Sequence, residues 1–280
     1  NGGDVRTPSV SVLLYILAGV LVVVTFCGNL VVIISISHFS QLHTPTNLLV
    51  LSLAAADFLV GVLIMPIIII QSIETCWYFG EVFCFIYTFF LALLTTASII
   101  NLAVIAIDRY IAICHPLTYS NKITVQIVVW LFAFTYSCSM SLFGGSTEGI
   151  IGLDPCPGDC IITLTPSWNI ADLIFSFLLP FSIIIVLYAH VFQGKNISKK
   201  SERKAAKTLG IVISIFLSCW LPYYCYTVIN QFFSLPPYLY NILTWIAYLN
   251  SGINPVIYAF FYPWFRKSRQ IHVQTWFIFD

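Results

Sequence analysis

The amino-acid sequence predicts an all-α membrane protein, a single bundle of seven transmembrane helices. Hydrophobic residues make up 59% of the 280 residues and charged residues only 8%, whereas soluble domains carry about 25% charged residues. Seven long apolar stretches each meet or exceed the roughly 20 residues that cross a bilayer as a helix. The loops between them leave no room for a soluble catalytic domain.

The seven stretches follow one another with short connections. They span about residues 10–36, 48–71, 83–113, 123–143, 167–192, 209–233 and 238–261. The first and fourth contain no charged residue, the second, third and fifth contain Asp57, Asp108 and Asp172, and the last two contain Pro222 and Pro255. Each of these prolines removes a backbone donor and permits a kink.

The ends of the chain follow from this layout. We expect residues 1–265 to form the transmembrane domain and residues 266–280 to form a cytoplasmic tail with a short amphipathic helix. Because the first residue is not Met, we expect the true N-terminus to be missing.

The positive charges predict the orientation. Of the 12 Lys and Arg residues, all but Arg6 lie on the side that is reached after an odd number of crossings. Basic loops stay in the cytoplasm, so that side is cytoplasmic and the N-terminus is outside. The acidic residues of the outer side are Asp4, Glu74, Glu81, Glu148, Asp154 and Asp159.

Four of the nine cysteines fall on the outer side, where disulfides persist. They are Cys76, Cys84, Cys156 and Cys160. Cys160 is the outer-loop cysteine nearer to the fifth helix, so we expect a Cys84–Cys160 bridge that ties the third helix to the second outer loop.

Ionisable side chains inside the membrane cost at least ~2.5–3.5 kcal/mol each and therefore need a purpose. Only Asp57, Asp108 and Asp172 fall in the seven stretches among the carboxylates, and no Lys does. The lack of a buried amine excludes a retinal-binding pump or opsin, and no chain of carboxylates and bases is present for a proton relay.

Asp57 has two readings. It can be an interhelical hydrogen-bond hub, or it can bind a monovalent cation such as sodium together with Ser98, Asn250 and Asn254, whose small oxygen donors suit a hard ion. No other cofactor is predicted.

Asp108-Arg109-Tyr110 lies where the third helix meets the cytoplasm. Arg109 can snorkel to the lipid headgroups, or it can form a switchable ion pair with Glu202. Arg109 and Glu202 each lie 18 residues below an outer-half residue of their helices, about 27 Å at ~1.5 Å per residue. Their matching depth makes the bridge feasible.

Asp172 is the candidate ligand carboxylate. Trp168, Asp172 and Ser176 recur at i, i+4 and i+8, so they line one face of the fifth helix. No Lys or Arg is expected near Asp172 from the sequence pattern, so a cationic ligand would supply the charge partner of its carboxylate. The alternative is a charge at the helix N-terminus that accepts hydrogen bonds from the outer loop.

Together the motifs resemble those of the rhodopsin-like G-protein-coupled receptors. They are Asn29, Asp57, Cys84, Asp108-Arg109-Tyr110, Trp130, Pro180, Tyr188, Cys219-Trp220-Leu221-Pro222 and Asn254-Pro255-Val256-Ile257-Tyr258. The run from Asn250 to Phe265, with Cys76 to Cys84 and Glu202 to Gly210, is similar to trace amine-associated receptors.

The resemblance implies a plasma-membrane, olfactory-type receptor for a small amine that raises cyclic AMP through a stimulatory G protein. It implies that the residues of G-protein coupling and of the switch to the active state are Asp108, Arg109, Tyr110, Tyr188, Glu202 and Tyr258. It also implies a bridge from Cys156 to an N-terminal cysteine, but no cysteine precedes Cys27, so we expect that bridge to be missing.

One departure concerns the ligand. Aminergic receptors hold the ammonium with an Asp seven residues after the disulfide cysteine of helix 3, and Leu91 stands there in this chain. Some members of the family use a helix 5 carboxylate at the position of Asp172 instead. The predicted ligand site comprises Asp172, Trp168, Ser176, Thr88, Leu91, Thr95, Trp220, Tyr223, Tyr224, Trp245 and Tyr248.

Other functions remain as alternatives. Each aromatic residue of that set taken alone can be packing, and Asp172 can be structural in a receptor for a neutral or peptide ligand. A channel or transporter is disfavoured because inverted repeats are absent. An enzyme is disfavoured because the sequence has no nucleophile elbow, phosphate loop or metal-ligand spacing.

Overall fold

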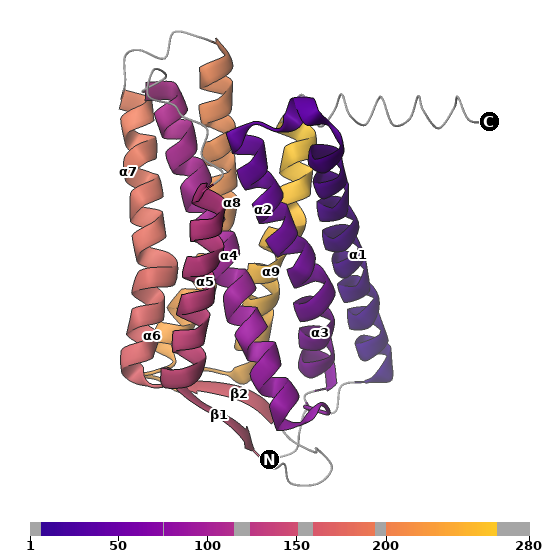
Figure 1. Ribbon diagram of the computed structural model, residues 1–280. Helices are drawn as coiled ribbons and strands as arrows, with labels where there is room; N and C mark the ends of the chain where they lie inside the picture. The colour runs from indigo at the N-terminus through magenta and orange to yellow at the C-terminus, as the bar shows by residue number, and fades with distance from the viewer. Residues whose placement is uncertain (1–6, 75, 115–123, 151–158, 194–199, 262–280) are drawn as a thin grey trace, which may run out of the picture.

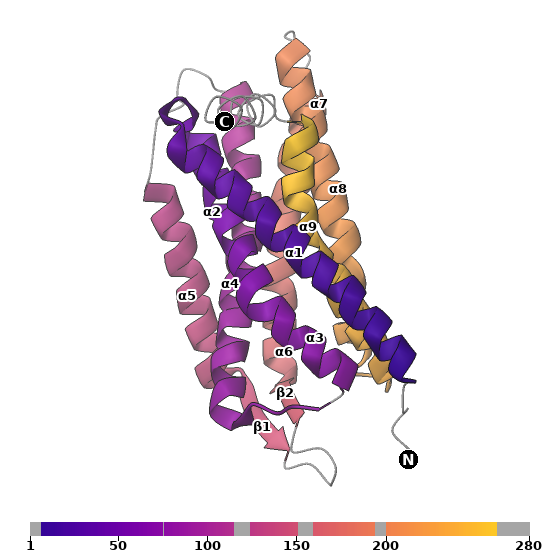
Figure 2. The same ribbon diagram turned by 90° about the vertical axis from the view of Figure 1, so that its right-hand side faces the viewer.

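The computed structural model describes residues 7–74, 76–114, 124–150, 159–193 and 200–261. Within these ranges seven helical spans lie side by side in one bundle (Figures 1 and 2). The fold class predicted from the sequence is therefore confirmed. The tail helix predicted within residues 266–280 lies outside the described residues.

The spans contain one to three helical segments each. In chain order they are α1 (Pro8–His38), α2 (Pro45–Leu59) with η2 (Val60–Ile64) and α3 (Met65–Glu74), α4 (Gly80–Cys114), α5 (Thr124–Phe143), α6 (Pro166–Asp172) with η3 (Leu173–Leu178) and α7 (Leu179–Gln193), α8 (Lys200–Ile229), and α9 (Pro237–Phe261). Six spans are long and apolar enough to cross a membrane. The seventh, α9, is more polar because it carries Asn241, Asn250 and Asn254.

Most helix ends lie within three residues of the predicted stretches. The exception is α8, which begins at Lys200 rather than near residue 209. The segment before residue 209 is rich in Lys, Glu and Ala, which favour helix, so the helix extends beyond the apolar stretch.

Two spans contain a π-helical turn that the apolar pattern did not predict. The turn η2 ends two residues before Pro66, and η3 ends two residues before Pro180. A proline cannot donate to the carbonyl four residues earlier and its ring pushes that carbonyl away. Here that carbonyl lies inside the π turn in both spans, which accounts for the irregular hydrogen bonding at these two places.

The helices α1 and α9 approach closely in the middle of the bundle. A Cβ atom added to Gly28 would lie 2.9 Å from Cβ of Pro255. Nearby, Nδ2 of Asn29 donates to the backbone carbonyl of Ser251 at 3.0 Å. Only a residue without a side chain fits at position 28.

A short β-hairpin covers the end of the bundle at which α1 begins (Figure 1). Its strands β1 (Gly145–Ile150) and β2 (Asp159–Leu164) pair antiparallel, with Gly149 opposite Cys160. The backbone N–H of Thr165 donates to the carbonyl of Gly144 and closes its base. The sequence pattern predicted a loop here and did not reveal the strands.

The α1–α9 contact predicts a position-specific stability effect. We expect Gly28→Ala to destabilise the protein by about 1–3 kcal/mol, the scale of overpacking a tight interface. Gly19→Ala in the same helix is the matched control, because nothing lies within 4 Å of an added Cβ there and Ala favours helix over Gly. The thermal midpoint of the purified protein in detergent should fall for Gly28→Ala alone. Equal midpoints for the two variants would contradict the close contact.

Candidate functional site

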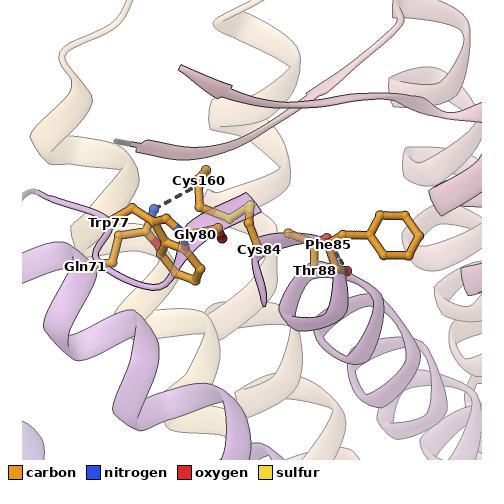
Figure 3. Close-up of a disulfide and its surroundings, with 7 residues drawn as sticks. All are labelled: Gln71, Trp77, Gly80, Cys84, Phe85, Thr88 and Cys160. Carbon is orange, nitrogen blue, oxygen red and sulfur yellow. Dashed lines mark hydrogen bonds between the residues drawn. A yellow bond between two sulfur atoms is a disulfide. The ribbon is translucent and has the colours of Figure 1, made fainter. Parts of the chain in front are cut away.

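The outer hairpin is fixed to the bundle by a disulfide. Cys84 in α4 and Cys160 in β2 are bonded, with their Cα atoms 5.7 Å apart, which confirms the predicted bridge. Nε2 of Gln71 also donates to the backbone carbonyl of Cys160 at 3.1 Å (Figure 3). The strand β2 is thus tied to two helices near the predicted ligand site.

A second outer cysteine is also bridged. Cys76 is disulfide-bonded, although the expectation from the sequence was that the second outer-side bridge would be missing. That expectation rested on the lack of an N-terminal cysteine and did not consider Cys76 as a partner. Cys156, on which it was centred, lies outside the described residues.

The turn before α4 positions Cys84. Gly80 has a φ of +77°, which side chains other than glycine rarely permit. Nε1 of Trp77 donates to the carbonyl of Gly80 at 2.9 Å (Figure 3), and its ring lies 5.7 Å from that of Tyr87. The indole therefore holds the turn against the first part of α4.

Asp172, at the end of α6, binds two neighbouring hydroxyl groups through one oxygen. Oδ1 accepts hydrogen bonds from Oγ of Ser176 at 2.7 Å and from the hydroxyl of Tyr136 at 2.8 Å. Oγ of Ser176 also lies 3.2 Å from the Tyr136 hydroxyl oxygen. Among the described residues Oδ2 has no hydrogen-bond partner, so one oxygen of the carboxylate is held and the other is free.

Tyr136 was missed by the sequence reasoning. It lies in α5, and the search for partners of Asp172 followed one face of a single helix, where it found Ser176. A polar hydroxyl in the apolar fourth stretch was the available signal, because a buried Tyr hydroxyl normally needs a partner.

The surroundings of Asp172 are aromatic. Tyr223 and Tyr224 of α8 lie close enough to its carboxylate for an electrostatic interaction between their hydroxyl groups and the carboxylate. The one Lys or Arg whose side chain the structure describes is Arg109, at the cytoplasmic end of α4. The described residues therefore provide no cation to balance Asp172. Trp168 is half-buried one turn earlier in α6.

Most of the predicted aromatic residues lie together around Trp220. Its ring is 5.9 Å from that of Tyr223, 6.2 Å from that of Tyr224 and 6.5 Å from that of Tyr248. Trp245 is not part of this group: its Nε1 donates to Oγ of Ser72 at 3.1 Å. Its ring packs in a separate cluster with residues of α1 and α3, because it lies on another face of α9.

The predicted residues of α4 line the other side of the same region. Leu91 packs in an apolar cluster that includes Tyr87 and Tyr248, and Thr95 lies beside the Tyr248 hydroxyl. Thr88 is buried and donates to the carbonyl of Phe85 at 2.9 Å (Figure 3).

Asp57 is fully buried in the middle of the bundle and receives three hydrogen bonds. Oγ of Ser98 donates to Oδ1 at 3.1 Å, Oγ of Ser251 donates to Oδ1 at 2.8 Å, and Nδ2 of Asn254 donates to Oδ2 at 2.7 Å. Asn250 is buried but does not bond to Asp57. Ser251, which the sequence reasoning did not name, takes the place expected for Asn250.

At the inner end, Arg109 pairs with its own neighbour. Its NH2 group lies 2.7 Å from Oδ2 of Asp108, and Oγ1 of Thr46 donates to the same oxygen at 2.6 Å. Tyr110 is half-buried and Tyr258 is buried in the main core. The side chains of Tyr188 and Glu202 lie outside the described part of the chain, so the Arg109–Glu202 bridge stays a prediction.

Seven helical spans, six of them long and apolar enough to cross a membrane, a disulfide from α4 to the outer loop and an Asp-Arg pair at the inner end of α4 define a seven-transmembrane receptor of the rhodopsin class. A sequence model of that family, described as 7 transmembrane receptor (rhodopsin family), matches residues 28–258.

The chain belongs to the trace amine-associated receptor family of these G-protein-coupled receptors. It is 41% identical to trace amine-associated receptor 7e of Mus musculus over 95% of this chain and 84% of that receptor. It is 40% identical to receptor 13c of Danio rerio, over 95% and 86%, and 42% identical to receptor 1 of Macaca mulatta, over 91% and 86%. It is therefore a multi-pass plasma-membrane receptor with a ligand and a G-protein partner, and not an enzyme.

The hairpin anchor predicts a strong effect of Cys160. We expect Cys160→Ser to lose about 2–5 kcal/mol of stability, as is usual when a native disulfide is removed, and to reach the cell surface poorly. Cys138→Ser is the matched control, because Cys138 is a free cysteine. Surface labelling of tagged receptor should fall for Cys160→Ser only. Normal surface levels and normal signalling in Cys160→Ser would rule out the anchoring role.

Proposed function

We propose that this receptor binds a small protonated amine at Asp172 and activates a stimulatory G protein, which raises cyclic AMP. Its N-terminus and the β-hairpin face the outside of the cell, and all Lys and Arg residues except Arg6 face the cytoplasm. The observation that carries the proposal is the carboxylate of Asp172, which has one oxygen free and no described cation near it.

The chemistry of Asp172 favours an ammonium group. A carboxylate in a low-dielectric site needs a cationic or hydrogen-bonding partner, and two hydroxyl donors satisfy only Oδ1. An ammonium bound to Oδ2 would complete the site with a charge-assisted hydrogen bond. The neighbouring rings of Tyr223 and Tyr224 add cation–π attraction of about 0.5–2 kcal/mol each.

The presence of Leu91 in helix 3 also favours Asp172 as the carboxylate that binds the ligand. The helix 3 Asp that the resemblance implies for amine binding is absent, and Leu91 packs there among apolar side chains. The relatives at about 40% identity carry trace amine-associated receptor names. If this chain also binds an amine, Asp172 is the carboxylate of the outer half that can hold it.

One observation favours a second candidate function. The hydrogen bonds from Tyr136 and Ser176 join α5 to the α6 segment, so Asp172 can serve structure alone in a receptor for a neutral or peptide ligand. Removing its charge while keeping its shape separates the two candidates.

Asp172→Asn is that substitution, because the amide oxygen can still accept the bonds from Tyr136 and Ser176. We expect it to weaken amine activation by about 2–5 kcal/mol, the scale for removing one partner of a buried charge pair. Tyr136→Phe keeps the charge and loses one hydrogen bond, so we expect a loss of about 1 kcal/mol.

The measurement is the amine concentration for half-maximal cyclic AMP at matched surface expression. Unchanged potency in Asp172→Asn would assign Asp172 to structure and overturn the amine proposal.

The inner end provides the proposed output. Trp220 and Pro222 lie in α8, and a proline inside a helix permits a kink about which the inner end of the helix could move. Outward movement of its inner end would expose Arg109 and Tyr258 to the G protein. The stimulatory type of G protein is inferred from the family resemblance.

A sodium ion at Asp57 would bias this output. The oxygen atoms at this site fit a hard cation, since one carboxylate and the hydroxyls of Ser98 and Ser251 lie together beside the amide group of Asn254. Three neutral donors leave the charge of a buried carboxylate uncompensated. An ion that binds only the inactive packing shifts the population by its differential affinity.

We therefore expect agonist affinity to fall as sodium is raised, and to fall less in Asp57→Ala and in Ser251→Ala. Agonist binding to membranes is measured in sodium and, as a control at equal ionic strength, in a large organic cation. The same affinity in both salts would leave Asp57 as an interhelical hub only.

A further inference from the structure

Two buried hydroxyl groups in the outer half of the bundle have no hydrogen-bond partner among the described residues. They are the hydroxyl of Tyr87 in α4 and Oγ1 of Thr244 in α9. Tyr87 is 5% exposed and Thr244 is 6% exposed. Leaving such groups unpaired costs about 1–3 kcal/mol each, so each needs a reason.

Other hydroxyl groups in the same protein do find partners. Tyr15 donates to Glu74 at 2.6 Å and Tyr136 donates to Asp172. Threonines within helices donate to the carbonyl four residues earlier, as Thr25 and Thr135 do. Thr244 has the same opportunity and does not take it. Its hydroxyl is therefore available for a group outside the helix.

Thr244 lies one turn from two residues of α9 that are close to Tyr87. Tyr240, Thr244 and Tyr248 follow one another at intervals of four, so they lie on one face of α9. Tyr87 lies within electrostatic range of both Tyr240 and Tyr248. Thr244 is the residue between those two, one turn from each, and Tyr248 packs in the same apolar cluster as Tyr87.

An aromatic path joins this pair to Asp172. Tyr223 lies within electrostatic range of Asp172, Tyr240 and Tyr248. Its ring is 5.9 Å from that of Tyr240, and Trp220 contacts both Tyr223 and Tyr248. One elongated molecule lying along Tyr223 could therefore touch the carboxylate at one end and the two hydroxyl groups at the other.

We propose that Tyr87 and Thr244 form a second polar subsite, which binds a neutral hydroxyl group at the far end of an amine held by Asp172. The preferred ligands are thus amino alcohols. This inference rests on the proposed amine function. A second ammonium group fits less well, because Leu91, one turn after Tyr87 in α4, is apolar and no described carboxylate interacts with the Tyr87 hydroxyl.

The test compares α,ω-amino alcohols with alkylamines and with α,ω-diamines of the same chain length, over a range of lengths. Cyclic AMP is measured in cells that express the native receptor, Tyr87→Phe or Thr244→Val. Both substitutions remove a hydroxyl and little volume. Tyr15→Phe is the matched control, because it removes a tyrosine hydroxyl that already bonds to Glu74.

In the native receptor the best amino alcohol should be about tenfold more potent than its alkylamine, the effect of one buried hydrogen bond. That advantage should disappear in Tyr87→Phe and in Thr244→Val, while alkylamine potency stays within about twofold of native. Tyr15→Phe should keep the advantage. Tyr87 and Thr244 lie on different helices, so a folding defect in one variant need not affect the other. The comparison of amino alcohols with alkylamines requires only one of the two variants at the cell surface.

Three results would overturn the subsite: no amino-alcohol advantage at any length, an equal advantage in the variants, or a preference for diamines that depends on Tyr87. These differ from failure of the amine function itself. In that case no amine activates the native receptor, or every amine is as potent on Asp172→Asn as on the native receptor.

Discussion

Every polar group inside the bilayer must find its partner within the bundle, because the hydrocarbon offers none. Oδ1 of Asn29 and Oδ1 of Asn101 have no hydrogen-bond partner among the described residues, but much of the middle of this receptor meets that need through Ser251. Its hydroxyl donates to Asp57 of α2, and its carbonyl accepts from Asn29 of α1. Ser98 of α4 and Asn254 of α9 donate the other two hydrogen bonds to this carboxylate. These bonds join four helices at one depth and thereby fix the frame on which both ends of the protein depend.

The outer half does not satisfy the same constraint with its own residues. Oδ2 of Asp172 and the hydroxyls of Tyr87 and Thr244 have no partner among the described residues. The surrounding structure is nevertheless well fixed, by the Cys84–Cys160 bridge and by the ring contacts around Trp220. A rigid frame with unpaired polar groups is what a binding site for a small polar molecule requires. These unpaired polar groups then determine which ligands the site binds.

The sequence predicted the seven spans closely because each apolar stretch must match the bilayer. It also named two of the three partners of Asp57, Ser98 of α4 and Asn254 of α9, because both are small polar residues in otherwise apolar stretches. It could not predict which neighbour a side chain meets, because that depends on helix rotation. Ser251 in place of Asn250, Tyr136 beside Asp172 and the separate environment of Trp245 are all of this kind. The hairpin was missed because apolar and polar residues do not alternate along either of its strands.

The most direct test of the account is a cryo-electron-microscopy structure of the receptor with an activating amine bound. The account predicts the amine nitrogen within hydrogen-bonding distance of Oδ2 of Asp172, with Tyr136 and Ser176 still bonded to Oδ1. An amine whose nitrogen lies away from Asp172, with the carboxylate contacts unchanged, would contradict it.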